Sequence, residues 1–132
     1  MIEIFNNHAT EILTLLFLIV TFLQSGIDKL TDWNGNISFI KNHFSNSPLK
    51  NAVPLLVGII LVLEVVASAF MILGIVNIFS NSSMDFAFYG AQLSAITIIC
   101  MLIGQRLAKD YAGAMTLAVY FIINMFLLYL LQ

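Results

Sequence analysis

Charged residues are scarce in this chain: they make up 9% of its 132 residues, whereas 61% are hydrophobic. Soluble domains carry roughly a quarter charged residues. A globular core of this length is too small to bury so much apolar surface, so most of the surface must face lipid. The composition therefore argues against a soluble domain and predicts a single small integral membrane domain.

Cationic residues and cysteines are also few. The five cations form no dense block or stripe, so no nucleic-acid partner is expected. The single cysteine, Cys100, lies inside an apolar run and has no second cysteine to pair with, which excludes dithiol redox chemistry within one subunit. The sequence also contains no metal-ligand cluster, hydrolase triad or phosphate-binding loop, so no metal site is expected.

Long apolar runs are the main feature that the sequence does have. Charged residues divide it into four apolar blocks: Ile12–Ile27, Val53–Val76, Phe86–Gln105 and Ala112–Leu131. A helix needs about 20 residues to cross the hydrocarbon core, and the first block reaches that length if the helix begins near Ala9 and Lys29 snorkels to the interface. The predicted fold is an all-α membrane protein, a four-helix bundle of two antiparallel hairpins, with spans at about 9–29, 53–76, 86–105 and 112–131.

The connections between these spans contain turn signals. The longest connection, Leu30–Ala52, has a turn-forming cluster on each side of the amphipathic stretch Ile37–Phe44, which is predicted to be an interfacial helix. The second connection, Asn77–Asp85, is predicted to be a polar turn. The third, Ala108–Ala112, is so short that the last two spans must be antiparallel neighbours. The two clusters in the longest connection are Trp33–Asn36 and Ser45–Pro48.

The cationic residues also predict an orientation. All five lie in the first and third connections or at their edges: Lys29, Lys41, Lys50, Arg106 and Lys109. Positively charged connections stay in the cytoplasm, so both termini are expected to lie outside it.

Glu64 is the one charged residue inside the four apolar blocks. An ionisable group near the bilayer centre costs several kcal/mol and is by default a functional candidate. The alternative is a protonated acid that hydrogen-bonds to another helix for packing. Counting about 1.5 Å per residue places Tyr120 and Asn124 of the fourth span at a similar depth. On the third span, Gly90, Ser94 and Gly104 are predicted to face other helices, whereas Leu127 is taken as a lipid-facing position.

A second polar layer lies where the first and third spans end. The side chains of Lys29 and Arg106 tilt toward the N-termini of their own helices, and that of Glu64 tilts the opposite way. We therefore predict that these charges converge on a polar pocket, with interfacial anchoring of the two cations as the alternative. The candidate pocket residues are Glu64, Lys29, Arg106, Gln24, Tyr120 and Asn124.

Several short motifs resemble those of the DoxX family of small bacterial four-span membrane proteins, over about Leu15 to Tyr129. They are FLQSGIDKL (Phe22–Leu30), the spaced residues Pro54, Gly58 and Glu64, ILG (Ile72–Gly74) and GQRLAKDYAGA (Gly104–Ala114). Relatives often have a glycine pair shortly after the glutamate, where this chain has Val65–Ser68. Ala67 and Ser68 keep that region small. The positions that match the recurring pattern are Ser25, Gly26, Lys29, Leu30, Gly58, Glu64 and Gly74.

The resemblance implies a location in the bacterial cytoplasmic (inner) membrane and a loosely defined role. Some relatives are subunits of membrane oxidoreductases that deliver electrons to quinone, others are linked to oxidative-stress complexes, and many have no assigned activity. The first hypothesis is a redox-linked subunit that binds a quinone or another small molecule. In that hypothesis Glu64 is the proton acceptor or hydrogen-bond partner, and Lys29 or Arg106 supplies positive charge.

The second hypothesis is a noncatalytic accessory or assembly subunit that packs against larger membrane proteins. Proton-coupled transport is the weaker third, because four spans leave little room for alternating access without oligomerisation. Whether the chain is an enzyme stays open. No intrinsic cofactor is expected, and quinone is the one candidate. The expected partners are the lipid bilayer and either other membrane subunits or further copies of the chain.

Overall fold

The structure is a computed structural model that describes residues 1–81 and 83–132. Helices make up nearly all of this part of the chain, and it contains no strand. They are α1 (Ile2–Asn7), α2 (Ala9–Thr31), α3 (Trp33–His43), α4 (Val53–Asn81), α5 (Asp85–Leu107) and α6 (Tyr111–Leu131). Of these, α2, α4, α5 and α6 are long and apolar enough to cross a membrane. The predicted all-α membrane fold with four spanning helices is confirmed.

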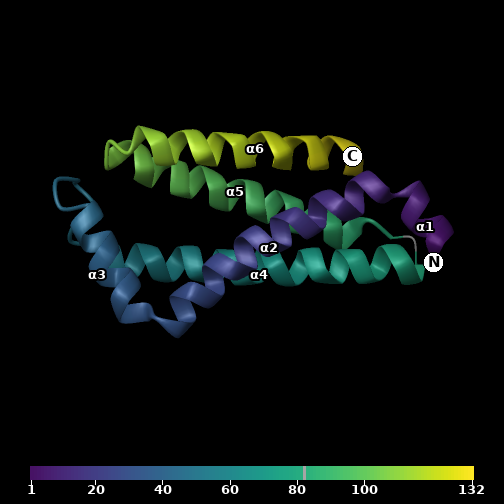
Figure 1. Cartoon of the computed structure of the whole chain (residues 1–132), viewed down its shortest axis with the longest axis horizontal. Helices are drawn as coiled ribbons and strands as arrows, with labels where there is room; N and C mark the ends of the chain where they lie inside the picture. The colour runs from purple at the N-terminus through teal and green to yellow at the C-terminus, as the bar shows by residue number, and fades with distance from the viewer. Residues whose placement is uncertain (82) are drawn as a thin grey trace.

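The spanning helices form two antiparallel hairpins. In the first, α2 leads through α3 into α4, and in the second, a tight turn joins α5 to α6. The hairpins associate mainly through α4 and α5, while α2 crosses α4 obliquely and also contacts α6 (Figure 1). Both termini lie at one end of the bundle, and α3 lies at the other end together with the α5–α6 turn (Figure 1). We refer to this second end as the α3 end.

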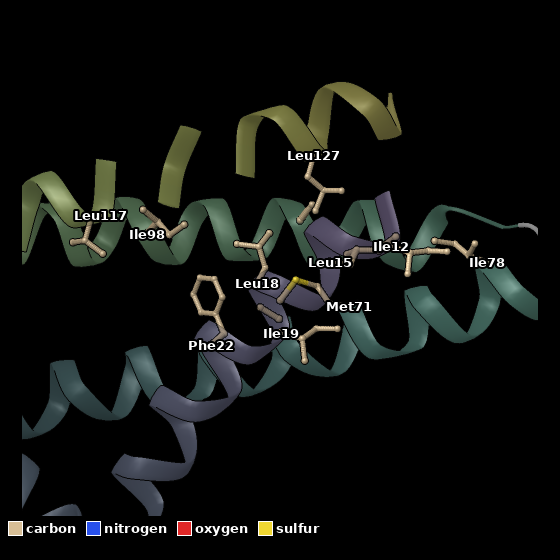
Figure 2. Packing of buried hydrophobic residues seen from close by; sticks show 13 residues of the cluster. Ile12, Leu15, Leu18, Ile19, Phe22, Met71, Ile78, Ile98, Leu117 and Leu127 are labelled. Carbon is tan, nitrogen blue, oxygen red and sulfur yellow. The ribbon is translucent and has the colours of Figure 1, made fainter. Parts of the chain in front are cut away.

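The core of the bundle is a cluster of buried apolar side chains between the helices. Residues of α2 meet Met71 and Ile78 of α4, and Leu127 of α6 closes the cluster from the other side (Figure 2). The α2 residues are Ile12, Leu15, Leu18, Ile19 and Phe22. A smaller cluster, Ile37 with Val53 and Val57, packs α3 against α4. Large apolar side chains also cover the outer faces of the spanning helices, where they contact lipid.

Small residues set the distance between α4 and α5. Gly74 lies directly against the backbone of Ala87, and Gly90 lies against Met71. Gly90 and Ser94 are buried between helices, as predicted, and Gly104 faces the ring of Phe44 just beyond α3. Close helix approach in lipid depends on such small residues, because van der Waals contact replaces the hydrophobic effect as the attraction between helices.

One predicted lipid-facing position is wrong. Leu127 has an exposed fraction of 0% and belongs to the main core cluster. Apolar side chains dominate α6, so hydrophobicity alone does not show which side packs inward, but Leu127 lies three residues after the buried Asn124 and so on the same face.

Two predicted boundaries also differ from the structure. The cluster Trp33–Asn36 forms the first turn of α3 and is not a loop, because the Asp32 carboxylate accepts a hydrogen bond from the Gly35 amide at 3.2 Å and caps the helix. Residues 77–81 of the predicted polar turn continue α4, which ends at Asn81. Ser82 lies outside the described residues. The third connection is as tight as predicted, with Lys109 in the left-handed region at φ 60°.

Candidate functional site

A buried ion pair joins α2 to α4. The Lys29 ammonium nitrogen lies 3.2 Å from each carboxylate oxygen of Glu64. It also donates a hydrogen bond to Ser25 Oγ at 2.7 Å, and Ser25 Oγ in turn donates to Glu64 Oε1 at 3.1 Å. The side chains of Lys29 and Glu64 are 12% and 1% exposed. The three side chains therefore satisfy one another's hydrogen-bonding groups, and the charged groups of Lys29 and Glu64 have little contact with solvent.

The local sequence of α2 explains this arrangement. Ser25 and Lys29 are four residues apart, so they lie on the same face of the helix. Gly26, beside them, faces α4, where a Cβ would make ordinary van der Waals contact with Val65 at 3.6 Å. Because α2 and α4 are antiparallel, the side chains of Lys29 and Glu64 tilt toward each other.

Burial of this ion pair requires desolvation of both charged groups, which is unfavourable in free energy. Removing two charges from water carries a penalty of several kcal/mol per ion, which mutual attraction offsets only when hydrogen bonds satisfy the remaining donors and acceptors. Here the ammonium group has three acceptors: both Glu64 oxygens and Ser25 Oγ. This satisfied cluster accounts for the placement of a carboxylate in the middle of a spanning helix.

The other predicted pocket residues do not join this pair. Arg106 is exposed at the end of α5, with its guanidinium carbon 4.9 Å from the centroid of the Tyr111 ring, a cation–π contact. Gln24 is exposed on α2. Tyr120 is partly buried, and its ring packs 6.2 Å from that of Phe17.

Asn124 is buried but belongs to a separate polar contact between α5 and α6. Its amide oxygen accepts a hydrogen bond from Ser94 Oγ at 2.5 Å, and its amide nitrogen donates to the Ala91 carbonyl at 2.9 Å. This contact is structural, since a buried amide requires such partners. Counting residues along a helix does not predict rotation about the helix axis, and rotation decides which group Asn124 meets.

A pocket of about 650 Å³ lies beside the ion pair, between α3, α4 and α5. Apolar side chains form most of its wall, including Leu56, Val57, Ile60 and Met101, and the aromatic rings of Phe39 and Phe44 come from the α3 end. Lys29 is one of the polar residues in the lining, so it connects the buried pair to the pocket. The other polar lining residues include Asn36, His43, Gln105 and Asp110.

His43 is a site residue that the sequence patterns did not identify. Its Nε2 lies 3.1 Å from Asp110 Oδ2 and 3.2 Å from Gln105 Oε1. Asp110 Oδ1 accepts a hydrogen bond from the Gly113 amide at 2.9 Å, which caps α6. His43 is 62 residues before Gln105 in the chain, so no local spacing links them. The sequence feature that could have pointed to His43 is its position at the end of the amphipathic stretch Ile37–Phe44, because the end of the third span has a polar layer that this stretch could meet.

Comparison with known proteins identifies the family. The sequence model of a family described as DoxX matches residues 12–105. This range includes α3 and α4, most of α2 and α5, and the residues Ser25, Lys29 and Glu64. Neither a search of curated proteins nor a search of solved structures finds a match. Because the family match covers well over half of the chain and the fold is a four-span bundle, this protein belongs to the DoxX family of membrane proteins.

Proposed function

We propose that this DoxX-family protein is a redox-linked subunit of a membrane complex and that it binds a quinone in the pocket between α3, α4 and α5. One observation carries the proposal: the buried Lys29–Glu64 ion pair meets an apolar pocket through Lys29, which belongs both to the pair and to the pocket wall. Ligand sites combine an apolar cavity with a few polar groups that set the ligand's orientation, and this pocket has both.

The residues of the pocket fit the chemistry of a quinone. Apolar and aromatic side chains suit a flat ring with a hydrocarbon tail, and a volume of about 650 Å³ accommodates the ring and the start of the tail. Lys29 supplies positive charge beside a carbonyl oxygen, and the Glu64 carboxylate behind it is the group that takes up or releases a proton. A quinone bound there would receive its electrons from a partner subunit.

Filling the pocket should abolish most quinone binding. A Cβ at Gly104 would lie 3.6 Å from Phe44 Cζ, so the side chain in Gly104→Leu would occupy pocket space. Overfilling costs about 1–3 kcal/mol, so we expect the affinity of the purified protein for a short-chain ubiquinone to fall by about tenfold or more. Isothermal titration calorimetry in detergent measures this affinity.

Gly58→Leu is the matched control for Gly104→Leu. Gly58 is also a helical glycine with room for a Cβ, 3.9 Å from Trp33, but it lies outside this pocket. We expect the quinone affinity of Gly58→Leu to stay within about threefold of wild type, a change below 1 kcal/mol. Equal loss in both variants contradicts the assigned pocket. No binding to the wild-type protein, together with stable copurification of other membrane subunits, would favour the accessory-subunit function.

The same proposal places the protein in the bacterial cytoplasmic membrane with both termini outside the cytoplasm. Lys41, Lys50 and Lys109 belong to α3, to the connection after it and to the α5–α6 turn, which all lie at the α3 end (Figure 1). A periplasm-dependent phosphatase should therefore be active when fused after Gln132 and silent when inserted after Asn46. A phosphatase that is active after Asn46 and silent after Gln132 would mean that both termini lie in the cytoplasm.

A further inference from the structure

The surroundings of His43 determine which of its ring nitrogens carries a hydrogen. Both neighbours of Nε2, the Asp110 carboxylate and the Gln105 amide oxygen, are acceptors. Nε2 must therefore be the donor, and in the neutral ring Nδ1 then holds the lone pair. Within residues 1–81 and 83–132, no hydrogen bond to Nδ1 is formed. The ring thus keeps one acceptor that no side chain of the described residues uses.

The ring of His43 is also held in place by two aromatic contacts. It stacks on Phe39, with centroids 6.1 Å apart and an interplanar angle of 12°. It meets Phe44 edge to face at 5.4 Å. All three rings line the pocket, and the His43 side chain is 31% exposed. A histidine oriented by a carboxylate on one nitrogen presents its other nitrogen in a defined direction.

We propose that His43 is the ligand-recognition residue for a hydroxyl group, so that the pocket takes a quinol as well as a quinone. In this inference, which rests on the proposed quinone site, Nδ1 accepts a hydrogen bond from the ring hydroxyl of the quinol. Asp110 and Gln105 are positioning residues, because in the neutral ring they hold the hydrogen on Nε2 and so leave the lone pair on Nδ1. Lys29 has a positive charge and no acceptor and suits a carbonyl oxygen, so the two polar parts of the pocket lining recognise different oxidation states of one ligand class.

Two probes separate this role from simple packing: a short-chain ubiquinol, and the same molecule with both hydroxyls methylated. The methyl ether cannot donate a hydrogen bond. We expect wild-type protein to bind the quinol about tenfold more tightly than the ether, as the loss of one hydrogen bond allows. His43→Phe keeps a ring against Phe39 and Phe44 but has no acceptor, so the ratio should fall to about one. Because His43 lines the pocket, the quinol-to-ether ratio within each protein is the readout, and not the absolute affinity of the variant.

The tautomer of His43 supplies a readout that needs no ligand. Nitrogen NMR of the free protein should show hydrogen on Nε2 of His43. His8 is the internal reference, since its Nδ1 lies 3.3 Å from Glu11 Oε2 and should carry the hydrogen. The variant His8→Gln assigns the two signals. Asp110→Asn keeps an oxygen to cap α6 but removes the carboxylate, and should weaken the preference for Nε2–H.

The outcomes distinguish this inference from the proposed function. If quinone binds to wild type but the quinol and its ether bind equally, the role of His43 is rejected while the quinone site stands. A hydrogen on Nδ1 of His43 in the free protein also rejects this role. If neither quinone nor quinol binds, the proposed function fails and the role of His43 fails with it.

Discussion

Glu64→Gln should lower the free energy of unfolding by about 3–5 kcal/mol, because it leaves the buried ammonium group of Lys29 without its counter-charge. The amide keeps the shape of the side chain, so the loss reports on charge and not on packing. Adding Lys29→Met should restore part of the stability, since the double variant no longer buries an unpaired ion. A double-mutant cycle, read by unfolding in detergent, should then give a coupling energy of about 1–3 kcal/mol.

Two matched comparisons make this cycle specific. Glu11 pairs with His8 at 3.3 Å, but this pair is more exposed, so Glu11→Gln should cost only about 0–1 kcal/mol. Arg106 packs on Tyr111 and not on Glu64, so a cycle of Glu64→Gln with Arg106→Met should be additive. Additivity between Glu64 and Lys29 would show that the pair contributes no coupling. Glu64 would then be a neutral packing acid.

Gly74→Ala should have the second-largest effect on stability. A Cβ at position 74 would lie 2.6 Å from both the amide nitrogen and the Cα of Ala87. Backbone atoms cannot rotate away as a side chain can, so α4 and α5 would have to separate, at a cost of about 1–3 kcal/mol. Gly90→Ala should cost less, because the nearest atom there is the flexible Cγ of Met71 at 2.7 Å, although the Met71 amide nitrogen follows at 2.9 Å.

Gly58→Ala is the control for this second prediction. Its Cβ would meet nothing closer than the Trp33 ring at 3.9 Å. In a helix with room for the methyl group, replacing glycine by alanine stabilises by about 0.4–1 kcal/mol. The two substitutions should therefore shift the thermal midpoint in opposite directions. Equal shifts would mean that α4 and α5 are not as close at Gly74 as the structure shows.

The four spans could be predicted from the sequence, because an apolar run long enough to cross a bilayer has few stable structures other than a spanning helix. Helix ends were less readable. The start of α3 depends on the Asp32 side chain as a cap, and turn-forming residues that follow such a cap look like a loop in the sequence. The burial of Leu127 depends on packing between α6 and its neighbours, which the hydrophobicity of α6 alone does not encode.

The candidate site was readable only in part. The convergence of Lys29 and Glu64 follows from helix direction and side-chain tilt, which the order of the spans already determines. The rotation of each helix about its axis does not follow from that order, and it separates Asn124, Tyr120 and Arg106 from the pair. His43 contacts Asp110 only after α3 folds against the end of α5, so that contact depends on tertiary structure that the local sequence does not reveal.

The location of a bound quinone is the most direct measurement of the central claim. A photoreactive short-chain quinone should label the purified protein on the segments that line the pocket, Phe39–Phe44 and Cys100–Leu107. Excess unlabelled quinone should suppress this labelling, and Gly104→Leu should reduce it. Labelling spread over exposed lipid-facing residues such as Val20 and Ile122, unaffected by competitor, would contradict a quinone site in this pocket.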